Sequence, residues 1–217
     1  RIGPEILKGV ADQYRKLRNT FRYMLGALGG FDEAEKVAVA DMPELEQYVL
    51  ALLGELDGKL RQAVEDYDFN TYTRSLVDFM NEDLSAFFFD IRKDRLYCDV
   101  PGGLKRRAYR TVLDTLFQAL IRYAAPVLVF TSEEVWGTRY PDAGSVHLLE
   151  WPEVPAVDAD MAVWAAVRRL RERVTEAIEP LRREKTIRSG LEAEVVVPSN
   201  AVPIGFTPED LSELFIT

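Results

Sequence analysis

Residues 14–28, YRKLRNTFRYMLGAL, carry the most informative pattern in this chain. Their apolar side chains recur every three or four positions, which places them on one face of a helix. This apolar stripe consists of Tyr14, Leu17, Phe21, Met24, Leu25 and Leu28. A neighbouring face carries, at the same spacing, Arg15, Arg18, Asn19 and Arg22. The pattern predicts a helix that buries the apolar stripe and presents three guanidinium groups and one amide beside it.

Such a row of cationic and amide groups suits an RNA strand. Arginine side chains grip phosphates or stack on bases, and an asparagine can read a base edge. Two alternatives stay open. The arginines could form salt bridges with acidic neighbours inside a helical bundle, and Asn19 could form an interhelical hydrogen bond.

Chain length and composition indicate the broad class of protein. A chain of 217 residues with 47% hydrophobic content is long enough for one full core and a small satellite unit. No apolar run approaches the roughly 20 residues that cross a bilayer, and the first residues, RIGPEILKGV, carry no secretory hydrophobic region. Their abrupt start is typical of a piece excised from a longer protein. We expect no membrane partner.

Cysteine and histidine are almost absent from the chain. The single cysteine, Cys98, excludes an intramolecular disulfide and indicates the reducing cytoplasm, and we expect it to be half-buried. His147 is the single histidine, so we expect no structural zinc site. The chain contains no GxGxxG motif and no P-loop. We therefore expect no catalytic residue and no cofactor in this chain.

The net charge of −9 is unevenly distributed. Three windows, residues 1–30, 92–110 and 168–188, hold 21 of the 27 basic residues but only 8 of the 36 acidic ones. A chain that is acidic overall but basic in patches can steer RNA to one side and repel it elsewhere. The alternative is that these runs are solvated faces without a partner.

Helical periodicity dominates the first two thirds of the chain. It predicts helices over residues 4–28, from Asp41 to about 67, from Asp68 or Asn70 to about 94, and over 104–124. A short helix follows, capped by Thr131 or Ser132, and residues 137–157 read as a loop. Helices of these lengths with short connections predict an antiparallel bundle.

The last third of the chain has a different pattern. Residues 158–185 predict a long amphipathic helix that Pro180 kinks or ends early. Residues 191–198 alternate as a strand, and residues 208–217 read as one helical turn followed by a second strand. The expected fold is mainly α, with a helical bundle at 1–152 and a small mixed α/β extension at 153–217.

The end of the third predicted helix offers a second candidate site. Lys93 and Arg95 follow Arg92, and Tyr97 lies beside them, where an exposed ring would stack on an unpaired base. Tyr97 could instead pack in the core. Because one helix face cannot take three successive rings, we expect two of residues 87–89 in the core and one against another domain.

A third basic patch opens the helix at 104–124. It consists of Lys105, Arg106, Arg107 and Arg110. Cations at a helix start oppose the helix dipole. The patch therefore indicates either a phosphate partner or a neighbouring acidic helix.

Four blocks of the sequence resemble the anticodon-binding region of isoleucyl-tRNA synthetases, in the order of that family. They are residues 14–28, residues 83–97 (DLSAFFFDIRKDRLY), residues 123–136 (YAAPVLVFTSEEVW) and residues 170–197. The resemblance implies a helical bundle followed by a small α/β extension. It also implies that Arg18 and Asn19 lie toward the anticodon, and that the segment with Lys93, Arg95 and Tyr97 approaches the anticodon stem-loop.

The same resemblance implies the partners. They are the tRNA for isoleucine and the catalytic and editing domains of the same polypeptide, with no DNA. ATP and Mg²⁺ would act in the catalytic domain, whose HIGH-type and KMSKS-type motifs this chain lacks, and the family's cysteine-rich zinc module is also absent. The chain would not be catalytic alone but part of a ligase. Two alternatives stay open: a valyl- or leucyl-type synthetase, and a helical protein-interaction module that binds no RNA.

Overall fold

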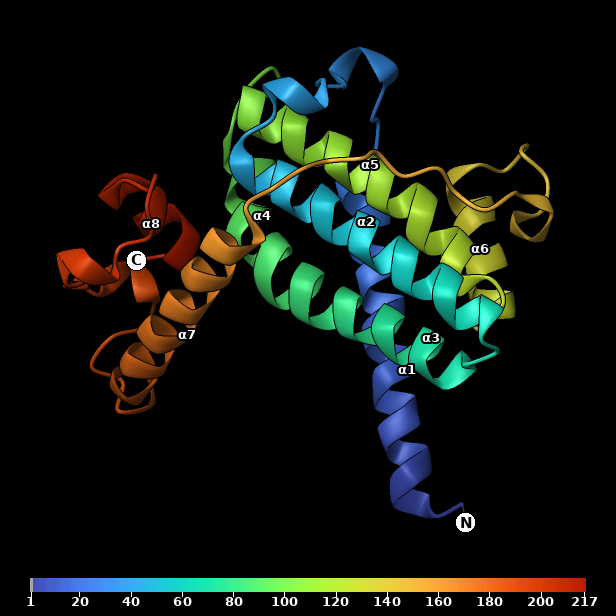
Figure 1. The fold of residues 1–217 in the computed structure, drawn as a ribbon, viewed down its shortest axis with the longest axis horizontal. Coiled ribbons are helices and arrows are strands. Elements are labelled where there is room, and N and C mark those ends of the chain that lie inside the picture. Colours follow the sequence, from blue (N-terminus) through green and yellow to red (C-terminus); the bar gives the residue numbers. More distant parts are fainter. Residues whose placement is uncertain (1) are drawn as a thin grey trace. The chain divides into compact units, whose positions relative to one another are not determined.

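The computed structural model describes residues 2–217, and these form helices and loops (Figure 1). They divide into two compact units, one that reaches to Asp158 and one formed by Ala159–Thr217. The first unit contains α1 (Pro4–Ala27), α2 (Glu44–Glu65), α3 (Phe69–Asp78), α4 (Phe89–Cys98), α5 (Leu104–Ala124) and α6 (Val129–Arg139). The second contains α7 (Met161–Arg183) and α8 (Pro208–Phe215). No helix in the described part of the chain is both long and apolar enough to cross a membrane.

Helix α5 forms the centre of the first unit. Most of its side chains are buried, including Val112, Leu116 and Phe117, which have no exposed surface. Helices α1, α2, α4 and α6 all pack against it (Figure 1). The predicted helical bundle is therefore confirmed, because the buried apolar side chains of these helices face α5 or one of its neighbours.

The third predicted helix is longer than expected. The chain is helical from Phe69 to Cys98, and a wider π-helical segment, η3 (Phe79–Phe88), joins α3 to α4. Asp68 begins this run as its N-cap and accepts a hydrogen bond from the backbone N–H of Thr71 at 3.0 Å. The break predicted from Arg95 onward therefore begins only after Cys98, whose exposed side chain contradicts the expected half-burial.

The expectation that one ring of residues 87–89 would face another domain is wrong. All three phenylalanines are buried, with exposed fractions of 3%, 0% and 6%. Each ring meets a different helix: Phe87 lies against Tyr48 of α2, Phe88 against Tyr109 of α5, and Phe89 against Tyr23 of α1. The π-helical turn widens the local helix, and three helices surround this segment.

Helix α6 starts earlier than predicted. Thr131 and Ser132 do not cap it but lie buried inside it, because the helix begins at Val129. The hydroxyl of Thr131 is instead hydrogen-bonded to the hydroxyl of Tyr14 on α1 at 3.0 Å. A contact between helices that are distant in sequence has taken the place of a local cap.

The described extension, residues 159–217, contains no strand, so its predicted mixed α/β character does not appear. Residues 193–198 have no regular secondary structure, and a single strand is not stable without a partner. The second predicted strand would have supplied that partner, but its residues belong to α8, which Thr207 and Asp210 start with a capping box. Helix α7 passes Pro180 and ends within one turn of it.

A buried carboxylate ties the loop after α6 to the bundle. Asp57 of α2 accepts hydrogen bonds from the Tyr123 hydroxyl at 2.5 Å, the Trp151 indole N–H at 2.6 Å and the Arg61 guanidinium at 2.7 Å. Burial alone would raise the pKa of Asp57, but these three donors outweigh it, and the pKa lies below its ordinary value. The charged form is therefore the one that the fold stabilises.

We expect Asp57→Asn to lower the free energy of unfolding at pH 7 by about 2 kcal/mol, because an amide is a weaker acceptor for these donors. The pKa of Asp57 is lower in the folded than in the unfolded chain, so the native protein loses this stabilisation as the pH falls below about 4. Urea unfolding of both proteins from pH 7 to pH 2.5 should show a gap that narrows in acid. A gap that is constant or widens in acid would contradict this assignment.

Candidate nucleic-acid interface

The apolar stripe of α1 turns the predicted binding residues outward. Leu17, Phe21 and Met24 are buried, with exposed fractions of 5%, 0% and 0%. The opposite side of the helix is exposed and carries Arg15, Arg18, Asn19 and Arg22. We call these four residues the α1 row. The structure therefore places all four where a partner can reach them.

Two members of the α1 row form ion pairs at the surface. Arg15 pairs with Asp12 at 2.7 Å, and Arg18 pairs with Glu134 of α6 at 3.3 Å. The paired side chains are between 46% and 70% exposed. Exposed ion pairs of this kind contribute only about 0–1 kcal/mol, so a phosphate group can displace the acids. The salt bridges considered as an alternative are thus present but weak.

Asn19 and Arg22 are exposed and have no such partner. Within the described part of the chain, neither side chain takes part in a hydrogen bond or ion pair. The interhelical hydrogen bond considered for Asn19 therefore does not form here. Its amide can both donate and accept a hydrogen bond, as recognition of a base edge requires.

The second predicted cluster lies on α4. Lys93 pairs with Asp90 at 2.7 Å, and Arg95 pairs with Asp99 at 3.4 Å. The Tyr97 side chain is 72% exposed, so the alternative that it packs in the core is wrong. The cluster thus combines an exposed ring with partly exposed cations.

Tyr23 connects the two clusters. It lies one turn after Asn19 on α1, stacks on Phe89 of α4 at 4.6 Å between ring centroids, and is hydrogen-bonded to the Tyr109 hydroxyl at 2.8 Å. Burial, with a smaller contribution from the nearby phenol of Tyr97, raises the pKa of Tyr23 to about 12. The α1 row and Tyr97 are therefore carried by adjoining helices.

Arg92 belongs to the core and not to this surface. Its guanidinium donates hydrogen bonds to both carboxylate oxygens of Glu46 on α2, at 2.6 and 2.8 Å. The exposed fractions of the two side chains are 4% and 0%. The one sequence signal that distinguishes Arg92 from Lys93 is its place on the apolar side of α4, with Phe89 and Leu96.

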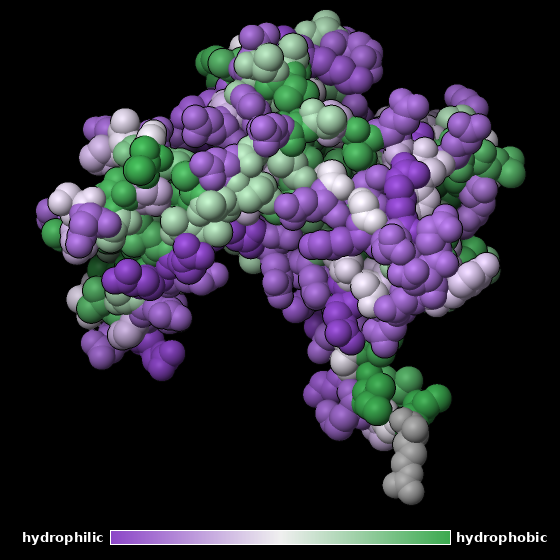
Figure 2. Space-filling view, in the orientation of Figure 1, coloured by the Kyte–Doolittle hydropathy of each residue, from purple (hydrophilic) through white to green (hydrophobic). Residues whose placement is uncertain are grey.

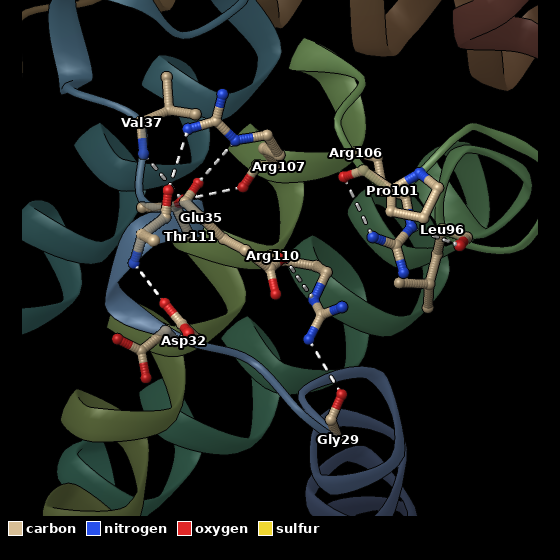
Figure 3. A network of polar contacts seen from close by, with 12 residues as sticks. Gly29, Asp32, Glu35, Val37, Leu96, Pro101, Arg106, Arg107, Arg110 and Thr111 are labelled. Atoms are coloured by element: carbon tan, nitrogen blue, oxygen red, sulfur yellow. Dashed lines mark hydrogen bonds and ion pairs between the residues drawn. The ribbon is translucent and has the colours of Figure 1, made fainter.

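Three arginines of the third basic patch, Arg106, Arg107 and Arg110, bind backbone carbonyls of the protein itself (Figure 3). Arg107 donates hydrogen bonds to the backbone carbonyls of Ala34, Glu35 and Lys36, and Arg110 donates one to the carbonyl of Gly29. These bonds fasten the connector between α1 and α2 to α5. Arg110 also pairs with Glu35 of the connector at 3.4 Å. Partners within the protein thus account for both side chains without the phosphate considered as one alternative.

Arg106 has the same kind of role at the other end of the patch. Its guanidinium bonds the carbonyls of Leu96 and Pro101, which belong to the end of α4 and the following turn (Figure 3). Backbone carbonyls have no sequence signature, so the charge pattern could not identify these partners. Among the described residues there is also no group of three or more His, Cys, Asp or Glu side chains that could hold a metal ion.

The N-terminal half of α1 has a different surface. Its apolar side chains continue beyond the bundle, and Figure 2 shows them as a hydrophobic group at the projecting end of the helix. They include Ile6, Leu7 and Val10, whose exposed fractions lie between 56% and 58%. The α1 row begins only where the bundle covers the apolar side of the helix.

We expect Glu134→Gln to raise affinity for an RNA stem-loop about threefold at low salt. The change removes a negative charge that competes with phosphate for Arg18, while the exposed pair itself stabilises the fold by less than about 1 kcal/mol. Fluorescence anisotropy with labelled RNA measures the first effect, and urea unfolding measures the second. Unchanged or weaker binding would show that Arg18 does not face the RNA.

A helical bundle whose first helix displays a cationic and amide row, with an exposed ring nearby, has the features of an RNA-binding module. A family model described as the anticodon-binding domain of tRNA ligase matches residues 46–197. The chain belongs to this family. The match starts within α2, so the α1 row lies outside it.

Known relatives extend the similarity to the whole chain. The isoleucine–tRNA ligase of Zymomonas mobilis subsp. mobilis is 59% identical over 226 residues, which cover 100% of this chain and 24% of the relative. Isoleucine–tRNA ligases of Agrobacterium fabrum (50%) and Caulobacter vibrioides (51%) match 100% and 99% of this chain and 23% and 22% of their own lengths. The resemblance to the isoleucyl family is thus confirmed, and the chain spans about a quarter of the length of these relatives.

Proposed function

We propose that this chain recognises the anticodon arm of the tRNA for isoleucine, as one part of a longer isoleucine–tRNA ligase. The observation that carries the proposal is the outward α1 row. Its three guanidinium groups would neutralise phosphates along the anticodon loop. The free amide of Asn19 and the exposed ring of Tyr97 would contact bases that leave the stack, with Lys93 and Arg95 holding the adjoining backbone.

The chain's contribution to the reaction would be selection. Binding of the anticodon arm would let the correct tRNA place its acceptor end in the catalytic domain, where ATP and Mg²⁺ support attachment of isoleucine. The catalytic and editing domains would be the protein partners, and the cytoplasm the compartment. We assign residues 1–152 to the anticodon-binding domain and residues 153–217 to an extension of it. No residue of this chain takes a catalytic role.

Titration with RNA tests the proposal directly. The 217-residue chain would be mixed with an anticodon stem-loop that carries an isoleucine anticodon, and separately with the same stem-loop carrying a valine or leucine anticodon. Each titration is run at 50 and 200 mM salt. We expect tighter binding of the isoleucine stem-loop and a steep loss of affinity with salt, because phosphate contacts release counterions.

The alternatives give different results. Preference for the valine or leucine anticodon would assign the chain to a related synthetase. Absence of binding at 50 mM salt would favour a protein-interaction module, in which the exposed arginines dock on an acidic protein surface. Binding without any anticodon preference would place discrimination in other parts of the ligase and would contradict the base contacts assigned to Asn19 and Tyr97.

A further inference from the structure

A cavity of about 540 Å³ opens where α1 ends, between the following connector, the middle of α5 and the end of α6. Its lining includes Phe31, Asp32, Asp114, Gln118, Arg139 and Tyr140. The cavity lies wholly within the first unit of the chain. Its volume is in the range of small-ligand sites, so it has room for one planar ring and ordered water.

The walls of this cavity are held in place. On one side, Arg107 and Arg110 fasten the connector to α5 through its backbone carbonyls. On the other, the Arg139 guanidinium lies over the rings of Phe117 and Tyr140, at 4.6 and 5.0 Å from their centroids. It also pairs with Asp114 at 2.6 Å. A ligand would thus meet a preformed site and would not have to order its walls.

The cavity offers both hydrogen-bond donors and acceptors. The Nη1 atom of Arg139 is buried and has no hydrogen-bond partner within the protein. Gln118 donates its amide N–H to the Tyr140 hydroxyl at 2.7 Å, which leaves the phenolic hydrogen and the amide oxygen for a ligand. Burial raises the pKa of Tyr140, so its phenol stays protonated and can donate.

The charges favour an uncharged ligand over a phosphate. Asp32, Glu33 and Asp114 line the cavity against two cations, Lys36 and Arg139, and both cations are already paired with carboxylates. A dianion would therefore be repelled. A planar ring with mixed donors and acceptors on its edge, as in a nucleobase, matches the two aromatic residues of the walls, Phe31 and Tyr140, and the polar groups beside them.

The cavity lies beyond the C-terminal end of the helix that carries the α1 row. Helix α6 runs beside α1 in the same direction, since Tyr14 meets Thr131 and Arg18 meets Glu134 further along both helices. Followed onward, α1 reaches Leu28 and α6 reaches Arg139, and both residues line the cavity. The α1 row and the cavity therefore lie along the same pair of helices, with the cavity at the C-terminal ends of both.

We propose that this cavity takes one unpaired base of the anticodon loop. The proposal rests on the function proposed above and adds a base-binding site that neither the α1 row nor Tyr97 provides. The base enters edge first, its ring lies against the aromatic walls, and its edge bonds to Arg139, Gln118 and Tyr140.

The test is a double-mutant cycle between the cavity and the RNA. Gln118→Phe fills the cavity, and the stem-loop is made with an abasic nucleotide at one loop position at a time. For the intact stem-loop we expect Gln118→Phe to weaken binding about tenfold, as for the loss of one stacked base. At one loop position the abasic RNA should bind Gln118→Phe and the unchanged protein equally well.

Two controls make the result specific. Gln62→Phe introduces the same ring on α2, away from the cavity, and should bind the intact stem-loop normally. Thermal unfolding checks that each variant is folded. If Gln118→Phe does not fold, Tyr140→Phe takes its place: it removes the hydroxyl that would donate to the base and that accepts the Gln118 N–H, and it should weaken binding about fivefold with the same dependence on loop position.

The outcomes separate this proposal from the general function. If the losses of affinity from Gln118→Phe and from the abasic nucleotide are independent at every loop position, so that their fold-changes multiply, the base-binding cavity is wrong. Unchanged binding of the intact stem-loop by folded Gln118→Phe would also overturn it. Arg18→Ala reports on the α1 row by itself. If Arg18→Ala weakens binding while the losses from Gln118→Phe and the abasic nucleotide are independent at every position, the proposed function stands and only the base-binding cavity is wrong.

Discussion

Replacing Arg92 by methionine lowers the free energy of unfolding by about 3–5 kcal/mol, the expected cost of leaving one member of a buried ion pair without its partner. The remaining carboxylate, Glu46, has no exposed surface and would lose two short hydrogen bonds. Urea unfolding measures the effect as a shift of the midpoint. Since a domain is stable by only about 5–15 kcal/mol, this is the largest stability effect that we expect from one substitution.

The double variant Arg92→Met/Glu46→Leu is the control. It removes both charges and should recover most of the lost stability, because apolar side chains can replace a buried ion pair with little cost. A single variant within about 1 kcal/mol of the unchanged protein would show that water reaches Glu46. The double variant should also bind RNA normally, since neither side chain faces the α1 row.

Arg18→Ala/Arg22→Ala is expected to weaken binding of the isoleucine stem-loop about 100-fold at 50 mM salt. Each lost phosphate contact also lowers the slope of log affinity against log salt by about 0.7. Titrations at four salt concentrations give both quantities. The fold should be unaffected, because both side chains are exposed and the one ion pair involved, with Glu134, is weak.

A matched variant distinguishes the effect of removing charge from the α1 row from the effect of removing the same charge elsewhere on the surface. Lys59→Ala/Arg74→Ala removes the same charge from exposed positions on α2 and α3. We expect it to change affinity less than threefold, through the general field alone. Equal losses in the two double variants would mean that RNA responds only to net charge, and the α1 row would then have no special role.

Local periodicity in the sequence predicted most of the helices and the exposed side of α1. Leu17, Phe21 and Met24 recur at helical spacing and are buried, which leaves Arg15, Asn19 and Arg22 on the surface. The sequence also identified Tyr97 as a candidate, and its ring is exposed. Helical spacing is a property of neighbouring residues, so these features did not depend on distant partners.

Arginine roles could not be predicted in the same way. The charge pattern predicts surface cations at Arg92, Arg107 and Arg110, yet these side chains bind a buried carboxylate or backbone carbonyls. An arginine carries five N–H donors and accepts many partners. Which partner it meets depends on segments 46 to 81 residues away, about which the local sequence carries no signal.

Spacing and matching blocks of residues were enough to predict the helical class, the family and the residues that α1 turns outward. Three features depend on how the elements pack: the burial of all of residues 87–89, the absence of the two predicted strands from the described residues, and the cavity at the end of α6. The physical reason is that rings, strands and cavity walls each need partners from other elements. Those contacts exist only once the helices have packed around α5.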